Sequence, residues 1–434
     1  MSKEAPAIPW KRWLGPLPGR GEARAISWLA LAAGVILCVL SLIRGFAGER
    51  FMGRTLGGDY AEFYVAGTIL NHFEPYRVYD LSLQSQLYQQ SVPDAPADQA
   101  FAVAHTPFLL YFFRPLAQLP YLWSYCLWLA LSLAIYCGTL RLLWTTAGIP
   151  ASSTRTATLL ALSWAPFLME TWIGGQVSIL AFAALTLALW FESRGQPFLA
   201  GLALAFLSYK VTLLLIPAFL LLAGKRWRML SGAAAGAAGL GMISFLLVGA
   251  KGMHAWFNTL LFYKGLTGMA EPALRRHKYV DLPAFLQMLA GHGGGWTRIA
   301  GLTLAGALLV WLAMAWKKSA GSAKTDPLLW AATIPFLLTL NAYLPIYETI
   351  LLVVAAALLA DAVPKRYPAY SETLTGWLVL LYLVPWITQA FAELIRFQLF
   401  TPVLVAFGLW TLWLARSAET AALAMNPAQE LSVE

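Results

Sequence analysis

Residues 25–43 read AISWLALAAGVILCVLSLI, a stretch without a charged side chain. An apolar run of this length allows a helix to cross the roughly 30 Å hydrocarbon core of a bilayer. It is too long for the apolar region of a signal peptide and lacks a convincing cleavage site, so we expect a retained first helix. Similar runs recur near residues 121–144, 155–171, 177–192, 228–250, 298–316, 327–341, 345–363, 372–391 and 397–415. The sequence therefore predicts an all-α polytopic membrane protein.

The composition supports this class. Of the 434 residues, 59% are hydrophobic and 12% are charged, whereas soluble domains carry about 25% charged residues. The net charge of +9 does not indicate nucleic-acid binding, because the basic residues lie at the ends of apolar runs, as the positive-inside rule places them. The three cysteines lie within apolar runs, without the spacing of a zinc site or a disulfide framework.

The predicted organisation has one membrane domain between two tails. Residues 1–24 form a basic cytoplasmic tail, residues 25–416 the transmembrane domain, and residues 417–434 a flexible cytoplasmic tail. Within the domain, residues 48–120 form a first outer loop with a re-entrant segment, and residues 251–297 form a second large outer loop.

Three further elements follow from local patterns. Residues 59–72 and 80–91 are expected to be amphipathic helices that lie along the membrane plane. Residues 197–223 are apolar but have basic residues beyond both ends, and each half is too short to cross the bilayer. This pattern favours a half-deep hairpin with Lys210 near its tip.

The first outer loop contains the sequence GGDYAEFY at residues 57–64. Asp59 is an acid at the membrane surface, and acids in that setting are costly and usually mark a site or a pairing with a base. One interpretation is a catalytic base that faces a lipid-linked substrate. The other is an N-cap, because Gly-Gly-Asp before a helical run is a good helix start; the two roles can coexist. Glu62 shares the helix face of Asp59 and could orient it, contact the substrate or remain a surface acid.

Basic residues are the second group of candidates, because a charged side chain at membrane depth is costly unless it is paired or solvated. Lys210 is one, and its alternative role is a structural ion pair with an acid such as Glu170 or Glu348. The others are Arg275, Arg276 and Lys278 in the second outer loop. The alternative for this run is a solvated loop or an anchor for lipid headgroups.

Aromatic and neutral polar residues complete the candidate site. The aromatic residues could stack on a substrate, although such residues more often form an interfacial belt; they are Tyr64, Tyr76, Tyr79, Trp172 and Tyr347. His105 is a lone histidine for which a structural role is favoured, and Gln176 could bind a substrate, although a loop turn explains the glycines before it. Asp59, Glu62 and Asp80 could hold a divalent cation, but their spacing is unspecific, so we expect no metal site and no cofactor.

Four blocks occur in a characteristic order. They are DYAEFYVA at 59–66 with PYRVYD at 75–80, HTPF at 105–108 with RPLAQLP at 114–120, GQ at 175–176 with AGL at 200–202 and Lys210, and NAYLPIYE at 341–348. This ordered set resembles glycosyltransferase family 87. In the fourth block Asn341 and Tyr343 stand where the family commonly has Pro-His surroundings, and Glu348 stands where it commonly has Asp, which leaves a histidine role there without support.

The resemblance implies a GT-C fold with about 10–12 transmembrane helices and amphipathic helices in the outer loops. It implies transfer of a sugar, most often mannose, from a polyprenyl phosphate to a lipid or glycan acceptor on the non-cytoplasmic side, with Asp59 as general base. Attack opposite the phosphate would invert the anomeric carbon. The candidate substrate-binding residues are Glu62, Tyr64, His105, Trp172, Gln176, Lys210, Arg275, Arg276, Lys278, Tyr347 and Glu348. The expected location is a bacterial inner membrane.

Two other function classes fit parts of the pattern. Many spans, an intramembrane lysine and a broken hairpin also suit a lipid or small-molecule transporter or flippase. Against transport, no inverted repeat is visible, and the polar residues concentrate in the outer loops rather than at the midplane. A non-catalytic membrane scaffold is the weaker third hypothesis.

Overall fold

The computed structural model describes residues 18–48, 56–92, 103–266, 276–291, 295–322, 324–342 and 344–425. Helices make up nearly all of this part of the chain, and the extended pairing in it is a single isolated bridge between Tyr279 and Pro345. The predicted all-α polytopic class is confirmed.

Seven helices in the described residues are long and apolar enough to cross a membrane. They are α2 (Arg20–Phe46), α6 (Tyr121–Thr146), α11 (Trp227–Leu266), α13 (Gly295–Lys318), η7 with α15 (Ile346–Leu351 and Leu352–Arg366), η8 with α16 (Pro368–Tyr370 and Ser371–Ile395) and α17 (Phe400–Met425). A bent pair and three shorter apolar helices lie among them. These are η3 (Pro166–Ile173) with α8 (Ser178–Ser193), then α9 with η4 (Pro197–Ala205 and Phe206–Tyr209), α10 (Val211–Ala223) and α14 (Pro327–Thr339).

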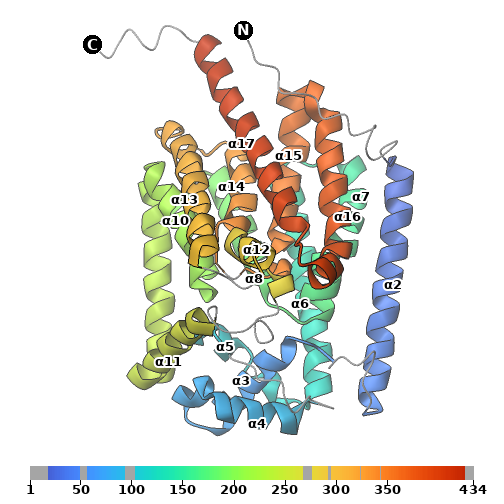
Figure 1. Ribbon diagram of the computed structural model, residues 1–434, viewed down its shortest axis with the longest axis vertical. Coiled ribbons are helices and arrows are strands. Elements are labelled where there is room, and N and C mark those ends of the chain that lie inside the picture. The colour runs from blue at the N-terminus through green and yellow to red at the C-terminus, as the bar shows by residue number, and fades with distance from the viewer. Residues whose placement is uncertain are drawn as a thin grey trace.

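Short helices gather at one end of the bundle, at the bottom of Figure 1. They are α3 (Tyr60–His72), η1 (Pro75–Tyr79), α4 (Leu81–Ser91), α5 (Pro107–Phe112) and η2 (Leu116–Gln118). The helices predicted at 59–72 and 80–91 thus correspond to α3 and α4. The first residue of α2 and the last of α17 lie at the opposite end (Figure 1).

Burial separates central helices from peripheral ones. Every residue from Leu328 to Thr339 of α14 is buried, and α15 is buried over most of its length. In contrast, α2 buries little more than a stripe of small residues that includes Gly34 and Cys38, and it exposes large apolar side chains such as Leu29. Apolar side chains that face outward in this way are typical of helices in contact with lipid.

The predicted hairpin is formed by α9 and α10, and Lys210 is the extended residue between them. Close contacts align α9 with α11 in the same direction, because Gly232 lies against Phe198 and Gly236 against Ala205. A Cβ on Gly232 would lie 2.1 Å from the Phe198 carbonyl oxygen, so glycine permits this approach. Since α9 and α11 run in parallel, α10 must return the chain to the level at which α9 began.

Basic residues mark the end of the bundle away from α3. Lys324 donates to the Ser193 carbonyl, Arg226 to the carbonyls of Ser319 and Ser322, and Arg366 pairs with Asp326. These contacts bring the loops after α8, α10, α13 and α15 together at one face.

Two predicted spans differ from the structure in their boundaries. The run at 155–171 is divided into α7 (Ala151–Ser163) and the π-helix η3, because Pro166 lacks the N–H that would continue an α-helix. Helix α11 extends beyond 250 to Leu266, with a bend at Gly249, where φ is +67°. Part of the second outer loop is therefore helical, as is α12 (Leu282–Leu289) within it.

Candidate functional site

The site begins with two glycine turns that interlock. The backbone N–H groups of Asp59 and Tyr60 donate to the Gly174 carbonyl at 3.1 and 3.3 Å. Gly175 has a φ of +74°, and a Cβ there would lie 2.5 Å from the Cβ of Tyr60. Glycine is required at this position both for the backbone conformation and for the close approach. The turn after η3 thus fixes the start of α3 from more than 100 residues away in the chain.

Asp59 occupies the N-cap position of α3, but its carboxylate makes no capping bond. Instead it accepts a hydrogen bond from Gln176 Nε2 at 2.5 Å. Gln176 is almost completely buried, whereas Asp59 is partly exposed. The capping interpretation therefore does not describe what this side chain does, and one oxygen of the carboxylate has no hydrogen bond within the described residues.

Glu62 lies one turn further along α3 and pairs with His105. Its Oε1 is 3.1 Å from His105 Nδ1, and the two side chains are 15% and 7% exposed. The His105 ring stacks parallel to that of Tyr209 at 6.1 Å between centroids and contacts Phe63 at 5.0 Å. Two aromatic rings therefore pack near the imidazole.

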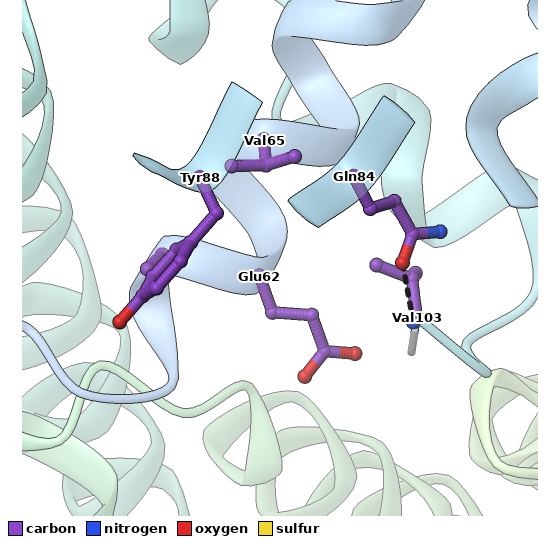
Figure 2. Close-up of a pocket in the computed structure, with 6 residues that line it drawn as sticks. Glu62, Val65, Gln84, Tyr88 and Val103 are labelled. Atoms are coloured by element: carbon purple, nitrogen blue, oxygen red, sulfur yellow. Dashed lines mark hydrogen bonds between the residues drawn. The ribbon is translucent and has the colours of Figure 1, made fainter. Parts of the chain in front are cut away.

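A narrow crevice lies behind this pair, between α3 and α4, with almost no room for a water molecule. Figure 2 shows Glu62 between Tyr88 and Gln84, with Gln84 Oε1 accepting a hydrogen bond from the Val103 N–H. The crevice is narrow and mostly apolar, and Glu62 is the charged residue among those that line it.

A second cluster forms where the hairpin tip meets the loop before α15. Lys210 Nζ lies 2.8 Å from Glu348 Oε1, 3.4 Å from the Tyr347 hydroxyl and 4.7 Å from the Tyr347 ring centroid. Glu348 is completely buried and also accepts from the Tyr209 hydroxyl at 3.0 Å. Of the two alternatives weighed for Lys210, the ion pair with Glu348 is present in this structure. Tyr209 was not among the candidates, although its position beside Lys210 was a usable signal.

Tyr347 connects the two groups. Its hydroxyl lies within electrostatic reach of Asp59 and Glu62 as well as of Glu348. The Thr171 hydroxyl donates to the Tyr347 carbonyl at 3.5 Å, which ties this residue to η3 and hence to the Gly174 turn. Seven of the predicted residues therefore converge: Asp59, Glu62, His105, Gln176, Lys210, Tyr347 and the buried Glu348.

Lys278, the last residue of the basic run, lies beside Glu170 of η3. Lys278 Nζ is 3.9 Å from Glu170 Oε2, and Glu170 Oε1 accepts from Gln389. The backbone around Lys278 is anchored, because Gln398 Nε2 donates to the His277 carbonyl at 2.6 Å and Val280 N–H donates to the Leu344 carbonyl. Arg275 lies outside the described residues, and Arg276 is described only as backbone, in η6 (Arg276–Lys278).

Other predicted residues are not brought to the cluster. The Tyr64 hydroxyl donates to the Leu119 carbonyl, and the Trp172 indole donates to the Leu129 carbonyl, so both anchor packing against neighbouring helices. Asp80 caps α4 and pairs with Arg77 at 3.1 Å. The hydrogen bond from the Ser82 hydroxyl, together with the bonds from the Leu83 N–H and Arg77, holds the pKa of Asp80 below its ordinary value.

Buried polar atoms without a hydrogen-bond partner are concentrated near the cluster. In the described part of the chain they include His105 Nε2, Thr106 Oγ1 and Gln176 Oε1, with Ser208 Oγ beside Tyr209. A buried polar atom left unpaired costs about 1–3 kcal/mol, so such atoms indicate a place where a ligand or water binds.

The profile of glycosyltransferase family 87 matches residues 104–344, which is more than half of the chain. The matched range includes His105, Gln176 and Lys210, whereas Asp59 precedes it and Glu348 follows it. No curated protein matches the sequence. With its all-α membrane architecture and its polar cluster at one end of the bundle, the chain belongs to glycosyltransferase family 87 and is a membrane glycosyltransferase.

Proposed function

We propose that this protein transfers a hexose, expected to be mannose, from a polyprenyl-phosphate donor to an acceptor hydroxyl, with Asp59 as general base. The observation that carries the proposal is the arrangement of the Asp59 carboxylate. It is not used as a helix cap, is partly exposed, and is oriented by a single hydrogen bond from a buried amide. A carboxylate held in this way keeps one oxygen available for a proton.

The reaction requires a base more than it requires an acid. A polyprenyl phosphate leaves as a stabilised anion, whereas the acceptor hydroxyl is a weak nucleophile that needs proton removal within hydrogen-bond reach. Asp59 would accept that proton as the new glycosidic bond forms and the bond from the sugar to phosphate oxygen breaks. Attack on the face opposite the phosphate inverts the anomeric carbon.

The phosphate needs cations, and Lys210 is the best placed. Its ammonium group lies at the hairpin tip, 21% exposed, above the buried Glu348. Lys278 is the second candidate, on an anchored loop beside Glu170. Arg275 and Arg276 remain candidates from the sequence, since arginine matches phosphate oxygens in a bidentate geometry.

The two ends of the bundle support an orientation. The cluster lies at the end that carries α3 and α4, and the basic loops that contain Arg226, Lys324 and Arg366 lie at the other end. Basic loops are typical of the cytoplasmic side, so we place the site on the non-cytoplasmic side, in a bacterial inner membrane. The acceptor would then be an outward-facing lipid or glycan.

The test uses the purified full chain in lipid nanodiscs. Polyprenyl-phosphate mannose, glucose and galactose are supplied as donors, with alkyl glycosides and a membrane lipid extract as acceptors. We expect transfer with mannose preferred and inversion of configuration in the product, measured by NMR. Retention of configuration would reject the single-displacement mechanism, and no transfer from any donor would reject the donor class.

A further inference from the structure

One ring nitrogen of His105 has a partner and the other does not. Nδ1 faces Glu62 Oε1 at 3.1 Å, and the rings of Tyr209 and Phe63 lie near the imidazole, with centroid distances of 6.1 and 5.0 Å. The backbone is also fixed, because the His105 carbonyl accepts from the Tyr79 hydroxyl at 2.8 Å. Nε2 is buried and has no hydrogen-bond partner in the described part of the chain.

The partner of Nδ1 determines what Nε2 can do. A carboxylate only accepts hydrogen bonds, so the Nδ1 that faces Glu62 carries the proton. In a neutral imidazole the other nitrogen is then an acceptor. An acceptor cannot bind a phosphate oxygen but does bind a hydroxyl group. Thr106, the next residue in the chain, also has a buried hydroxyl without a partner in the described residues.

We infer that Glu62 and His105 form a binding site for a carbohydrate hydroxyl group, in which His105 Nε2 accepts the hydrogen bond and Glu62 is the positioning residue that fixes the tautomer. This inference rests on the proposed function for the identity of the ligand, a sugar. The hydroxyl can belong to the transferred sugar or to the acceptor. In both cases the pair recognises substrate beside Asp59 and does not itself take the acceptor proton.

The first measurement needs no substrate. The protein has five histidines, so ¹⁵N-histidine NMR of the protein in nanodiscs, with the spectrum of His105→Phe subtracted, identifies the His105 nitrogens. We expect Nδ1 to be protonated and Nε2 to be unprotonated, and we expect Glu62→Gln to give a mixture of tautomers. A proton on Nε2 in the wild-type protein would overturn the inference.

The second measurement tests whether His105 binds one particular hydroxyl group of the substrates. Donors and acceptors that each lack one hydroxyl are compared in the wild type and in His105→Phe, which keeps an aromatic ring near Phe63 and Tyr209. For one analogue, the wild type should lose about 10- to 100-fold in kcat/KM, as expected for one lost hydrogen bond. His105→Phe should show that loss already with the complete substrate and little further loss with the analogue.

Several outcomes separate this inference from the proposed function. If the loss that appears only in the wild type comes from a missing donor hydroxyl, the site binds the transferred sugar. If it comes from a missing acceptor hydroxyl, the site binds the acceptor. If His105→Phe and the removal of each hydroxyl lowered kcat/KM independently of one another, Nε2 would bind only water. That result would overturn the inference while sugar transfer itself continued. If the wild type used no lipid-phosphate donor, the proposed function would fail, whereas the NMR result would still decide the tautomer. His254→Phe, which changes an exposed histidine on α11, is the matched control.

Discussion

At the scale of single residues, the cluster holds a completely buried carboxylate beneath a partly exposed cation. Glu348 is tolerated at zero exposure because Lys210 and Tyr209 both donate to it. Removing one partner of a buried ion pair leaves an uncompensated charge, which costs far more than the pair itself contributes. The structural role of Lys210 and its proposed role in binding phosphate can therefore be separated by experiment.

Lys210→Met should lower the stability of the protein by on the order of 3–5 kcal/mol, because it leaves Glu348 buried without its cation. The double variant Lys210→Met with Glu348→Gln removes both charges and should recover most of the thermal stability. If Lys210 binds the phosphate, the KM for the lipid donor should remain raised in the double variant. Recovery of both stability and donor KM would show that the lysine is only structural.

At the scale of elements, the position of Asp59 depends on a contact between two turns rather than on its own helix. The Gly174 carbonyl receives the first N–H groups of α3, and Gly175 allows Tyr60 to approach. Trp128 of α6 fixes this turn from behind by donating to the Gly175 carbonyl at 3.0 Å. A change at Gly175 therefore acts on the site through backbone placement.

Gly175→Ala should reduce turnover by about 100-fold, because an added Cβ pushes the start of α3 away and small misplacements of catalytic groups have effects of that size. Gly195→Ala is the matched control, since its φ of +73° gives similar backbone strain but its Cβ would meet nothing within 4 Å. Both variants should lose similar thermal stability from strain. Equal turnover in the two variants would argue against the interlocked turns as the device that positions Asp59.

The cap at the start of α4 should make the stability of the protein modestly dependent on pH. Asp80 accepts from the Ser82 hydroxyl at 2.7 Å and from the Ser82 and Leu83 N–H groups, and these bonds lower its pKa in the folded protein. Because the pKa of Asp80 is lower in the folded protein than in the unfolded chain, ionised Asp80 stabilises the fold above the unfolded-state pKa, near 4. This stabilisation is lost as the pH falls through the folded-state pKa. Asp80→Ala should cost about 1 kcal/mol at neutral pH and less below pH 4. Hydrogen exchange of the α4 amides measures this, and a cost independent of pH would contradict it.

At the scale of the whole molecule, the bundle has a buried centre, apolar flanks and two polar ends of different charge. Helices α14 and α15 form the buried centre, while α2 and α11 expose apolar side chains. The end with α3 contains Asp59 and Glu62, and the opposite end contains the loops with Arg226 and Lys324. This polarity is the basis for the proposed orientation.

Cysteine labelling tests that orientation. Glu74→Cys lies at the α3 end and Lys365→Cys at the other, and both positions are exposed. After the native cysteines are replaced by serine, a membrane-impermeant maleimide applied to intact cells should label position 74 at once and position 365 only after permeabilisation. The reverse pattern would place the candidate site in the cytoplasm.

Much of the architecture could be predicted because the bilayer constrains composition so strongly. Each predicted span overlaps helical structure, although the run at 155–171 is divided between α7 and η3, and the break at Lys210 was visible in the sequence. The π-helix at Pro166 and the bend at Gly249 were not predicted, although a proline and a glycine inside apolar runs were local signals for a break. The Asp59–Gln176 contact joins residues that no local pattern connects, whereas the pairing of Lys210 with Glu348 was one of the alternatives, since a lysine at membrane depth needs an acid.

The measurement that tests the central claim most directly is the turnover of Asp59→Asn with a lipid-phosphate sugar donor, compared with the wild type and with Asp361→Asn, an acid at the opposite end. Asparagine keeps the shape of the side chain and its contact with Gln176 but cannot take a proton. Since general base catalysis contributes about 10²- to 10⁴-fold, we expect kcat to fall by at least 100-fold in Asp59→Asn, with unchanged thermal stability and with normal turnover in Asp361→Asn. Full turnover in Asp59→Asn would contradict the account.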